Sequence, residues 1–173
     1  MKKYSSLISN FSSRKGFTLL EMIMVMGLLS ILTGVMTGIF GSVIDASLDS
    51  NATAGVDQDG RFIVARLVYD MQRASQIVAP AAPSSTVSQT LTIRIDSVDY
   101  TYSLDGAGNL QLTDNLSSNT LNSVNTRVNN LTFQRIGIGN TTDTVQVKFD
   151  IVSRIQERTG PETRNFQTTI GLQ

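Results

Sequence analysis

The dominant pattern in this sequence is an apolar run from Phe17 to Ile44 that contains one charged side chain, Glu21. A helix needs about 20 residues to cross the ~30 Å hydrocarbon core of a bilayer. The run therefore predicts a membrane-spanning helix, and the cations Arg14 and Lys15 stand directly before it. A carboxylate within a membrane helix costs roughly 2.5–3.5 kcal/mol on insertion scales, so we expect an interaction that compensates Glu21.

A second helical pattern follows the apolar run. From Arg61 onward, apolar residues recur every three or four positions, which predicts an amphipathic helix with one face packed on other elements. The segment from Asp45 to Gly60, which precedes this pattern, is weakly patterned and has Gly55 and Gly60 as soft points. Pro80 and Pro83 end the helix. The apolar series consists of Ile63, Leu67, Met71, Ala74, Ile77 and Val78.

Apolar and polar residues alternate over most of the remaining chain, as in half-buried antiparallel strands. The segment 113–127 is rich in Asn, Ser and Thr and predicts a surface loop. The fold class is therefore α+β, with one long N-terminal helix packed on an antiparallel sheet of about five or six strands. The predicted strands cover residues 91–95, 98–104, 110–112, 128–136, 145–151 and 166–170.

The charge distribution is uneven. The chain has 14 Lys and Arg against 14 Asp and Glu, but four of the cations precede Phe17, namely Lys2, Lys3, Arg14 and Lys15. A chain cut before Phe17 would be mildly acidic, which argues against a nucleic-acid partner because phosphate binding needs clustered cations. Cations flanking one end of a membrane helix place that end in the cytoplasm and the rest of the chain outside it.

The segment Lys15-Gly16-Phe17-Thr18-Leu19-Leu20-Glu21, followed at once by the apolar run, resembles the leader and helix start of type IV pilins and pseudopilins. The resemblance implies that prepilin peptidase cuts after Gly16 and methylates the new terminal residue, Phe17. It also implies that Glu21 supports assembly with other pilin or pseudopilin subunits on an inner-membrane platform. The run from Arg61 to Ala74 is most similar to minor pilins and minor pseudopilins. An ordinary secretory signal fits less well, because its apolar region has about 7–15 residues.

Two features of the sequence bear on this resemblance. Many pilins close a loop with a disulfide, whereas this chain has no Cys. Gly34 and Gly38 form a small-x-x-x-small motif that lets membrane helices approach closely. The motif suits a contact stripe between subunits, although Gly is also common in membrane helices in general, and both interpretations stay open.

The sequence offers little for catalysis. Without His or Cys, Ser-His-Asp and Cys-His nucleophilic sites are excluded, and we predict no catalytic residues, metal or cofactor. A calcium site in the turn at 105–109 is a minor alternative, because closely spaced oxygen ligands suit calcium. Asp96 and Asp99 are close in sequence, but they fit a solvent face better than a glycosidase pair.

These patterns divide the chain into four parts. Residues 1–16 are a cytoplasmic leader that is removed, 17–44 a transmembrane and assembly helix, 45–79 its amphipathic continuation, and 80–173 an extracytoplasmic β domain. The favoured function is a structural subunit of a type IV pilus-like or type II secretion filament. The alternative is a single-pass anchored domain that binds a partner and never polymerises.

Overall fold

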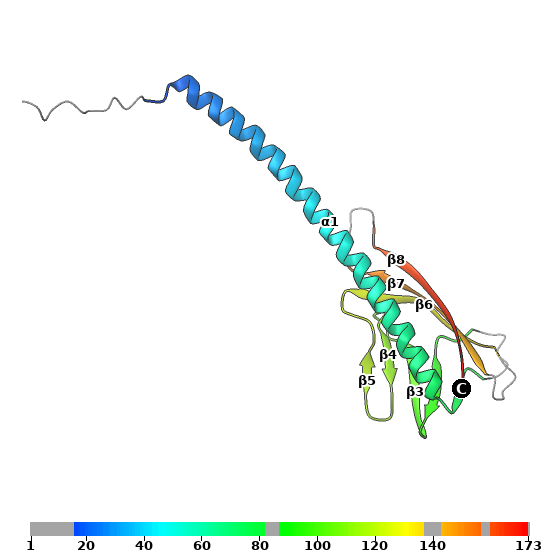
Figure 1. The fold of residues 1–173 in the computed structure, drawn as a ribbon. Coiled ribbons are helices and arrows are strands. Elements are labelled where there is room, and N and C mark those ends of the chain that lie inside the picture. Colours follow the sequence, from blue (N-terminus) through cyan, green and yellow to red (C-terminus); the bar gives the residue numbers. More distant parts are fainter. Residues whose placement is uncertain (1–15, 82–86, 137–142, 157–159, 173) are drawn as a thin grey trace, which may run out of the picture. The chain divides into compact units, whose positions relative to one another are not determined.

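The computed structural model describes residues 16–81, 87–136, 143–156 and 160–172. The chain divides into two compact units, Met1–Val43 and Ile44–Gln173. One helix, α1 (Leu19–Arg73), contributes residues to both units (Figure 1). The expected long N-terminal helix is therefore confirmed, and with it the α+β class.

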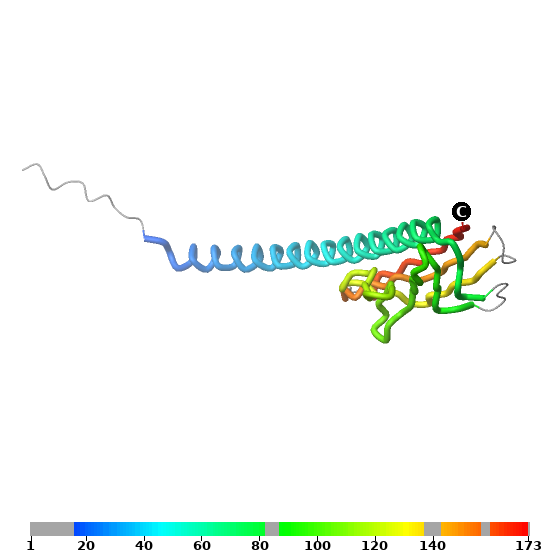
Figure 2. Tube along the Cα trace, turned by 90° about the horizontal axis from the view of Figure 1, so that it is seen from below, coloured from blue at the N-terminus to red at the C-terminus, as the bar shows by residue number. Residues whose placement is uncertain are grey.

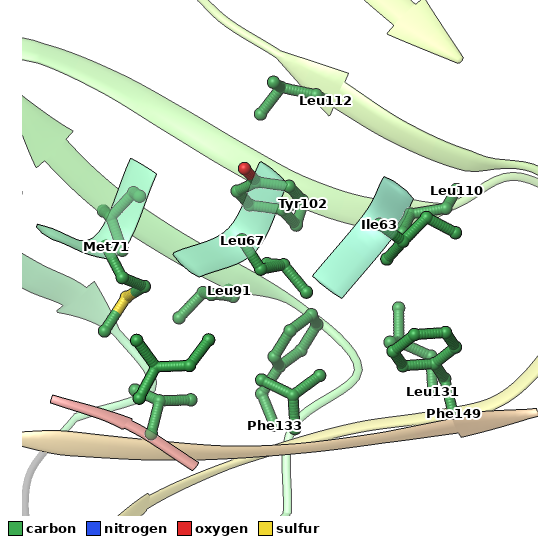
Figure 3. Packing of buried hydrophobic residues seen from close by; sticks show 14 of the residues in the cluster. Ile63, Leu67, Met71, Leu91, Tyr102, Leu110, Leu112, Leu131, Phe133 and Phe149 are labelled. Carbon is green, nitrogen blue, oxygen red and sulfur yellow. The ribbon is translucent and has the colours of Figure 1, made fainter. Parts of the chain in front are cut away.

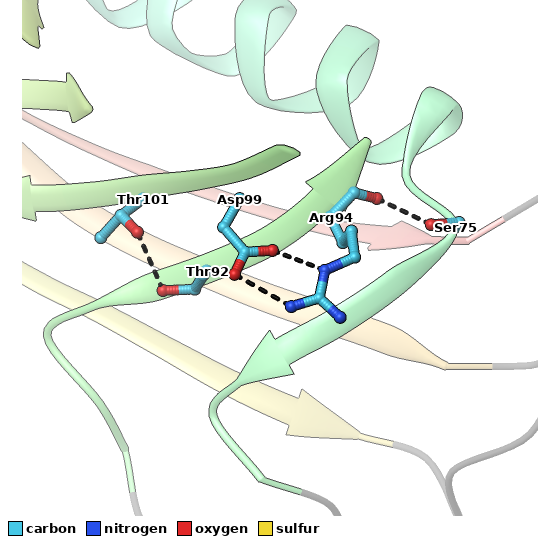
Figure 4. Close-up of polar contacts among 5 residues, drawn as sticks. All are labelled: Ser75, Thr92, Arg94, Asp99 and Thr101. Carbon is cyan, nitrogen blue, oxygen red and sulfur yellow. Dashed lines mark hydrogen bonds and ion pairs between the residues drawn. The ribbon is translucent and has the colours of Figure 1, made fainter. Parts of the chain in front are cut away.

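The predicted end of this helix is wrong. The helix was expected to reach residue 79, but it ends at Arg73, and β1 (Gln76–Ala79) pairs antiparallel with β2 (Leu91–Ile95). Ser75 stabilises the connection between α1 and β1, because its N–H and its Oγ both donate to the carbonyl of Arg94, at 2.8 and 3.0 Å (Figure 4). The β-branched pair Ile77 and Val78 suits a strand, and buried Ile77 lies opposite Ile93.

The first sheet contains five antiparallel strands in the order β1-β2-β3-β4-β5. Its short edge strand β5 falls inside the segment 113–127 that was predicted to be a loop. All three residues of β5 are exposed, so they carry no apolar alternation that the sequence pattern would show. The strands after β2 are β3 (Val98–Leu104), β4 (Leu110–Thr113) and β5 (Ser118–Thr120).

The second sheet contains β6 (Thr126–Ile136), β7 (Thr144–Ser153) and β8 (Thr163–Gly171), in that order and antiparallel. The described residues thus form eight strands in two sheets, where one sheet of five or six strands was expected. A bulge shifts the β6–β7 register between Asn129 and Thr132. It lets β6 bury Val128, Leu131 and Phe133 together, although their spacing breaks a strict alternation.

The core of the second unit forms between α1 and the two sheets. In Figure 2 the strands lie on one side of the part of α1 that follows Ile44. Figure 3 shows Ile63, Leu67 and Met71 of α1 among side chains from both sheets. These three helix residues are fully buried, and the largest fully buried side chains of the cluster are Tyr102, Phe133 and Phe149.

Gly60 is a packing position in α1. It was expected to be a soft point of the helix, but it is buried and helical. A Cβ at Gly60 would lie less than 3.0 Å from three ring carbons of Phe166. That ring also stacks on Phe149, with centroids 5.4 Å apart. The missing side chain is therefore what lets β8 press an aromatic ring against the helix.

Two buried carboxylates connect α1 to the first sheet and to the start of β6 with the segment before it. Asp59 accepts hydrogen bonds from the N–H and Oγ of Ser123, at 2.9 and 2.8 Å, and from the Oγ1 of Thr126. Asp70 accepts from the Tyr102 hydroxyl at 2.5 Å and from Arg66 Nε at 2.8 Å. Burial, and the hydrogen bond to Asp70, raise the pKa of Tyr102 far above its ordinary value, so the phenol remains a donor.

Candidate processing and assembly site

The predicted cleavage position lies just before the first turn of α1. Gly16 and Phe17 are exposed and belong to no helix or strand, and Phe17 is 74% exposed. The helix begins at Leu19. Arg14 and Lys15, on which the leader prediction depends, lie outside the described residues. The peptide bond after Gly16 is therefore in accessible, non-helical backbone, as a peptidase requires.

Thr18 caps the start of α1. Its Oγ1 accepts a hydrogen bond from the backbone N–H of Glu21 at 3.2 Å, and its carbonyl accepts from the N–H of Met22 at 3.2 Å. Thr-x-x-Glu is the signature of a capping box. Sequence reasoning did not assign this role to Thr18, although the pattern Thr18-Leu19-Leu20-Glu21 was the available signal.

Glu21 lies in the first helical turn and is exposed in the single chain. A carboxylate there interacts favourably with the helix dipole, by about 0.3–1 kcal/mol. This is smaller than the roughly 2.5–3.5 kcal/mol that an acidic residue costs deep in a membrane helix. The position of Glu21 thus offsets part of that cost, and a second interaction partner is needed to compensate the rest. This position also gives Glu21 a use in a chain that never polymerises.

The apolar part of α1 has the surface of a membrane helix. Its large apolar side chains from Leu19 to Ile44 are all exposed in the single chain. The hydroxyl of each Ser and Thr in this stretch donates to the backbone carbonyl four residues earlier, so none needs an outside partner. These residues are Ser30, Thr33, Thr37 and Ser42. By length and composition, α1 can cross a bilayer.

Gly34 and Gly38 lie one helical turn apart on this apolar surface. A Cβ at either position would meet no atom within 4 Å. The backbone is therefore bare and accessible at both positions in the single chain. A neighbouring helix can approach it closely without any rearrangement of side chains.

The turn after β3 satisfies its own carboxylate. Asp105 accepts hydrogen bonds from the N–H of Asn109 and of Ala107, both at 2.8 Å, and from the Asn109 side chain at 2.8 Å. These donors hold the pKa of Asp105 below its ordinary value. Within the described part of the chain, no group of three or more His, Cys, Asp and Glu side chains is placed to hold a metal.

Asp96 and Asp99 do not form a carboxylate pair. Asp99 receives two hydrogen bonds from Arg94, at 2.6 and 2.9 Å (Figure 4), and these lower the pKa of Asp99. Asp96 lies 3.6 Å from Arg73. Each carboxylate thus faces its own arginine, which does not suit general acid–base work by a pair of carboxylates.

A cleft of about 450 Å³ lies between α1 and the segment before β6. Its walls include Asn51, Gln58, Asn125 and Ser153, together with Asp59. The carboxylate of Asp59 already accepts three hydrogen bonds, so it is a structural acceptor rather than a free base.

Residues 11–37 match the family model described as the prokaryotic N-terminal methylation motif, a signature of type IV pilins and pseudopilins. The matched segment contains Gly16, Phe17, Glu21 and Gly34. The curated proteins and the solved structures compared with the chain gave no match. The resemblance of the N-terminal segment is thereby confirmed. The motif supports a type IV pilin-like precursor that prepilin peptidase processes and that assembles with other pilin subunits.

Proposed function

We propose that this chain, which carries the N-terminal methylation motif at residues 11–37, is a minor pilin or pseudopilin that acts as a structural subunit of a type IV pilus-like or type II secretion filament. The observation that carries the proposal is where the motif residues lie relative to the start of α1. Gly16 and Phe17 precede the capped turn, Glu21 lies within that turn, and the apolar surface follows without interruption.

In this proposal the basic leader, residues 1–16, stays in the cytoplasm. Prepilin peptidase cuts after Gly16 and methylates Phe17. Residues 17–44 span the inner membrane, 45–79 continue outward, and 80–173 fold outside the cytoplasm. An inner-membrane assembly platform then transfers the processed chain into a periplasmic or cell-surface filament.

Assembly depends on the charge pair that cleavage creates. The new amine at Phe17 keeps its positive charge after methylation, and in a staggered bundle it reaches Glu21 of a neighbouring subunit. A buried pair of this kind adds little stability, but leaving one member unpaired costs about 3–5 kcal/mol. It therefore selects the register of packing, while Gly34 and Gly38 let the apolar helices approach.

Substitutions at Glu21 test the proposal. Thr18 bonds to the backbone N–H of residue 21, so this cap survives any side chain at that position. Glu21→Gln removes the charge with little change in size, and Glu21→Leu removes both charge and polarity. Both should be cleaved normally and enter filaments poorly, and Glu21→Asp should be intermediate. The readouts are the intact mass of the membrane-bound chain and its amount in sheared filaments.

The position of Glu21 in the first turn of α1, where a carboxylate interacts favourably with the helix dipole, is the observation that favours the alternative, a permanently anchored binding domain. In that case the carboxylate serves only the helix start. Under this alternative, neither the unaltered chain nor Glu21→Leu would enter filaments. If Glu21→Leu instead crosslinks to partner pilins and assembles as the unaltered chain does, that result would overturn the assembly role of Glu21.

A further inference from the structure

After Ile44, most charged side chains of α1 are engaged within the chain. Asp57 pairs with Arg164 at 2.7 Å, and Asp59 and Asp70 hold the contacts to the strands described above. Arg66 pairs with Asp70, and Arg73 donates to the Tyr69 hydroxyl at 3.0 Å.

Three charged side chains of the same stretch differ from these. Asp45, Asp49 and Arg61 are exposed, and none of them has a hydrogen-bond or ion-pair partner among the residues that the structure describes. Asp45 and Asp49 are four residues apart, an arrangement in which like charges repel on one helix face. A cation from outside the chain would relieve this repulsion.

Exposed apolar side chains accompany these unpaired charges. Ile44 and Leu48, which are 59% and 37% exposed, stand directly before Asp45 and Asp49. Phe62 and Tyr69, each 51% exposed, follow Arg61. The helix between positions 49 and 61 exposes no large apolar side chain. Residues 44–49 are called the acidic segment below, and residues 61–69 the aromatic segment.

The two segments complement each other. The acidic segment offers aliphatic side chains beside two carboxylates, and the aromatic segment offers aromatic side chains beside a guanidinium. Aromatic residues and arginine contribute much of the binding energy at protein interfaces. They cannot meet within one chain, because Arg61 follows Asp49 by 12 residues and Asp45 by 16. That spacing is about 18–24 Å along a helix that rises 1.5 Å per residue.

We propose that the acidic segment of one copy docks on the aromatic segment of a second copy of this chain, with the helices parallel and staggered by about 18–24 Å. The inference rests on the proposed function, because insertion into one membrane is what makes the helices parallel. Each copy keeps one segment free, so the contact is head-to-tail and continues from copy to copy.

A disulfide ladder tests this geometry directly, because the chain has no Cys of its own. In full-length protein in its native membrane, Asp49→Cys together with Arg61→Cys should form dimers, trimers and longer species on oxidation. A variant with only one of the two cysteines can link at most two chains, so it should give no species larger than a dimer. Asp49→Cys with Gln72→Cys, an exposed pair 23 residues apart, is the wrong-offset control and should give no ladder.

Charge reversal supplies a second readout. Arg61→Asp should lower the amount of chain in sheared filaments about two- to fivefold, since exposed ion pairs are individually weak. Adding Asp45→Arg and Asp49→Arg to that variant should restore assembly, because the swapped charges again attract. Arg127→Asp, which changes an exposed arginine on β6, is the matched control and should leave assembly unchanged.

The outcomes separate this inference from the proposed function. If the unaltered chain keeps its leader and never enters filaments, the proposed function itself is wrong. If the chain assembles in a Glu21-dependent manner but gives no ladder, or gives an equal ladder with the wrong-offset control, only the stagger is wrong. Bands that contain other pilins and never a second copy of this chain also contradict it.

Discussion

Gly60 offers a quantitative test of how α1 packs on the second sheet. The change is Gly60→Ala, in the fragment 45–173 that closely matches the compact unit Ile44–Gln173. The new methyl group would lie less than 3.0 Å from three ring carbons of Phe166. The ring is stacked on Phe149, so it cannot move away without losing that contact.

Gly55→Ala is the matched control in the same helix, because a Cβ at Gly55 meets no atom within 4 Å. Replacing Gly by Ala inside a helix stabilises by about 1 kcal/mol through propensity alone. That gain applies at both positions, so the difference between the variants isolates the cost of overpacking, typically 1–3 kcal/mol. For a domain of this size, about 3–5 °C in Tm corresponds to each kcal/mol.

Thermal and denaturant unfolding followed by circular dichroism give the free energy of unfolding of each variant. Gly55→Ala should be more stable than the unaltered fragment, and Gly60→Ala should be less stable than Gly55→Ala by the stated amount. Phe166→Leu should reduce the harm done by Gly60→Ala, since the smaller side chain frees space. If Gly60→Ala stabilises as much as Gly55→Ala does, the ring does not lie on Gly60 and the packing described is wrong.

Three further predictions concern the second unit. The fragment 45–173 should be soluble without detergent, contain helix and sheet and melt cooperatively; aggregation would count against a boundary at Ile44. Asp59→Ala should destabilise it by about 1–3 kcal/mol, because the donors on Ser123 and Thr126 lose their acceptor, whereas Asp49→Ala should change it by less than about 0.5 kcal/mol. The folded-state pKa of Asp105 lies below its ordinary 3.8, so its contribution is present above that pH and lost as pH falls through the folded pKa. Asp105→Asn should therefore flatten the acid side of the stability profile, and an unchanged profile would contradict this.

The parts of the fold with regular apolar spacing were predictable from sequence. The alternation in residues 91–95 and 145–151 gave two strands correctly, because fully buried side chains alternate with less buried ones along each of them. The apolar series from Ile63 to Met71 gave the buried face of α1 for the same reason.

The errors come from features that spacing does not encode. Ile77 continues the helical period of α1, yet backbone pairing with β2 places it in a strand. The polar strand β5 shows no alternation, and the acceptor role of Asp59 depends on Ser123, 64 residues away. Gly60 looked like a weak point of the helix because the ring that fills its space comes from β8, far along the chain.

At the candidate site, the sequence located Gly16, Phe17 and Glu21 because the motif is contiguous along the chain. It did not reveal the cap, since a hydroxyl before a helix has many uses and only the bond from Glu21 N–H to Thr18 identifies one. The first-turn position changes the interpretation of Glu21, because its carboxylate interacts favourably with the helix dipole within a single chain.

The most direct test of the central claim is the intact mass and N-terminal sequence of this chain, isolated from the membranes of its native host. We predict a chain that begins at Phe17 with a methylated amine, and a precursor that stays uncut when Gly16→Val is introduced. A mature chain that still begins at Met1, or one cut elsewhere, would contradict it.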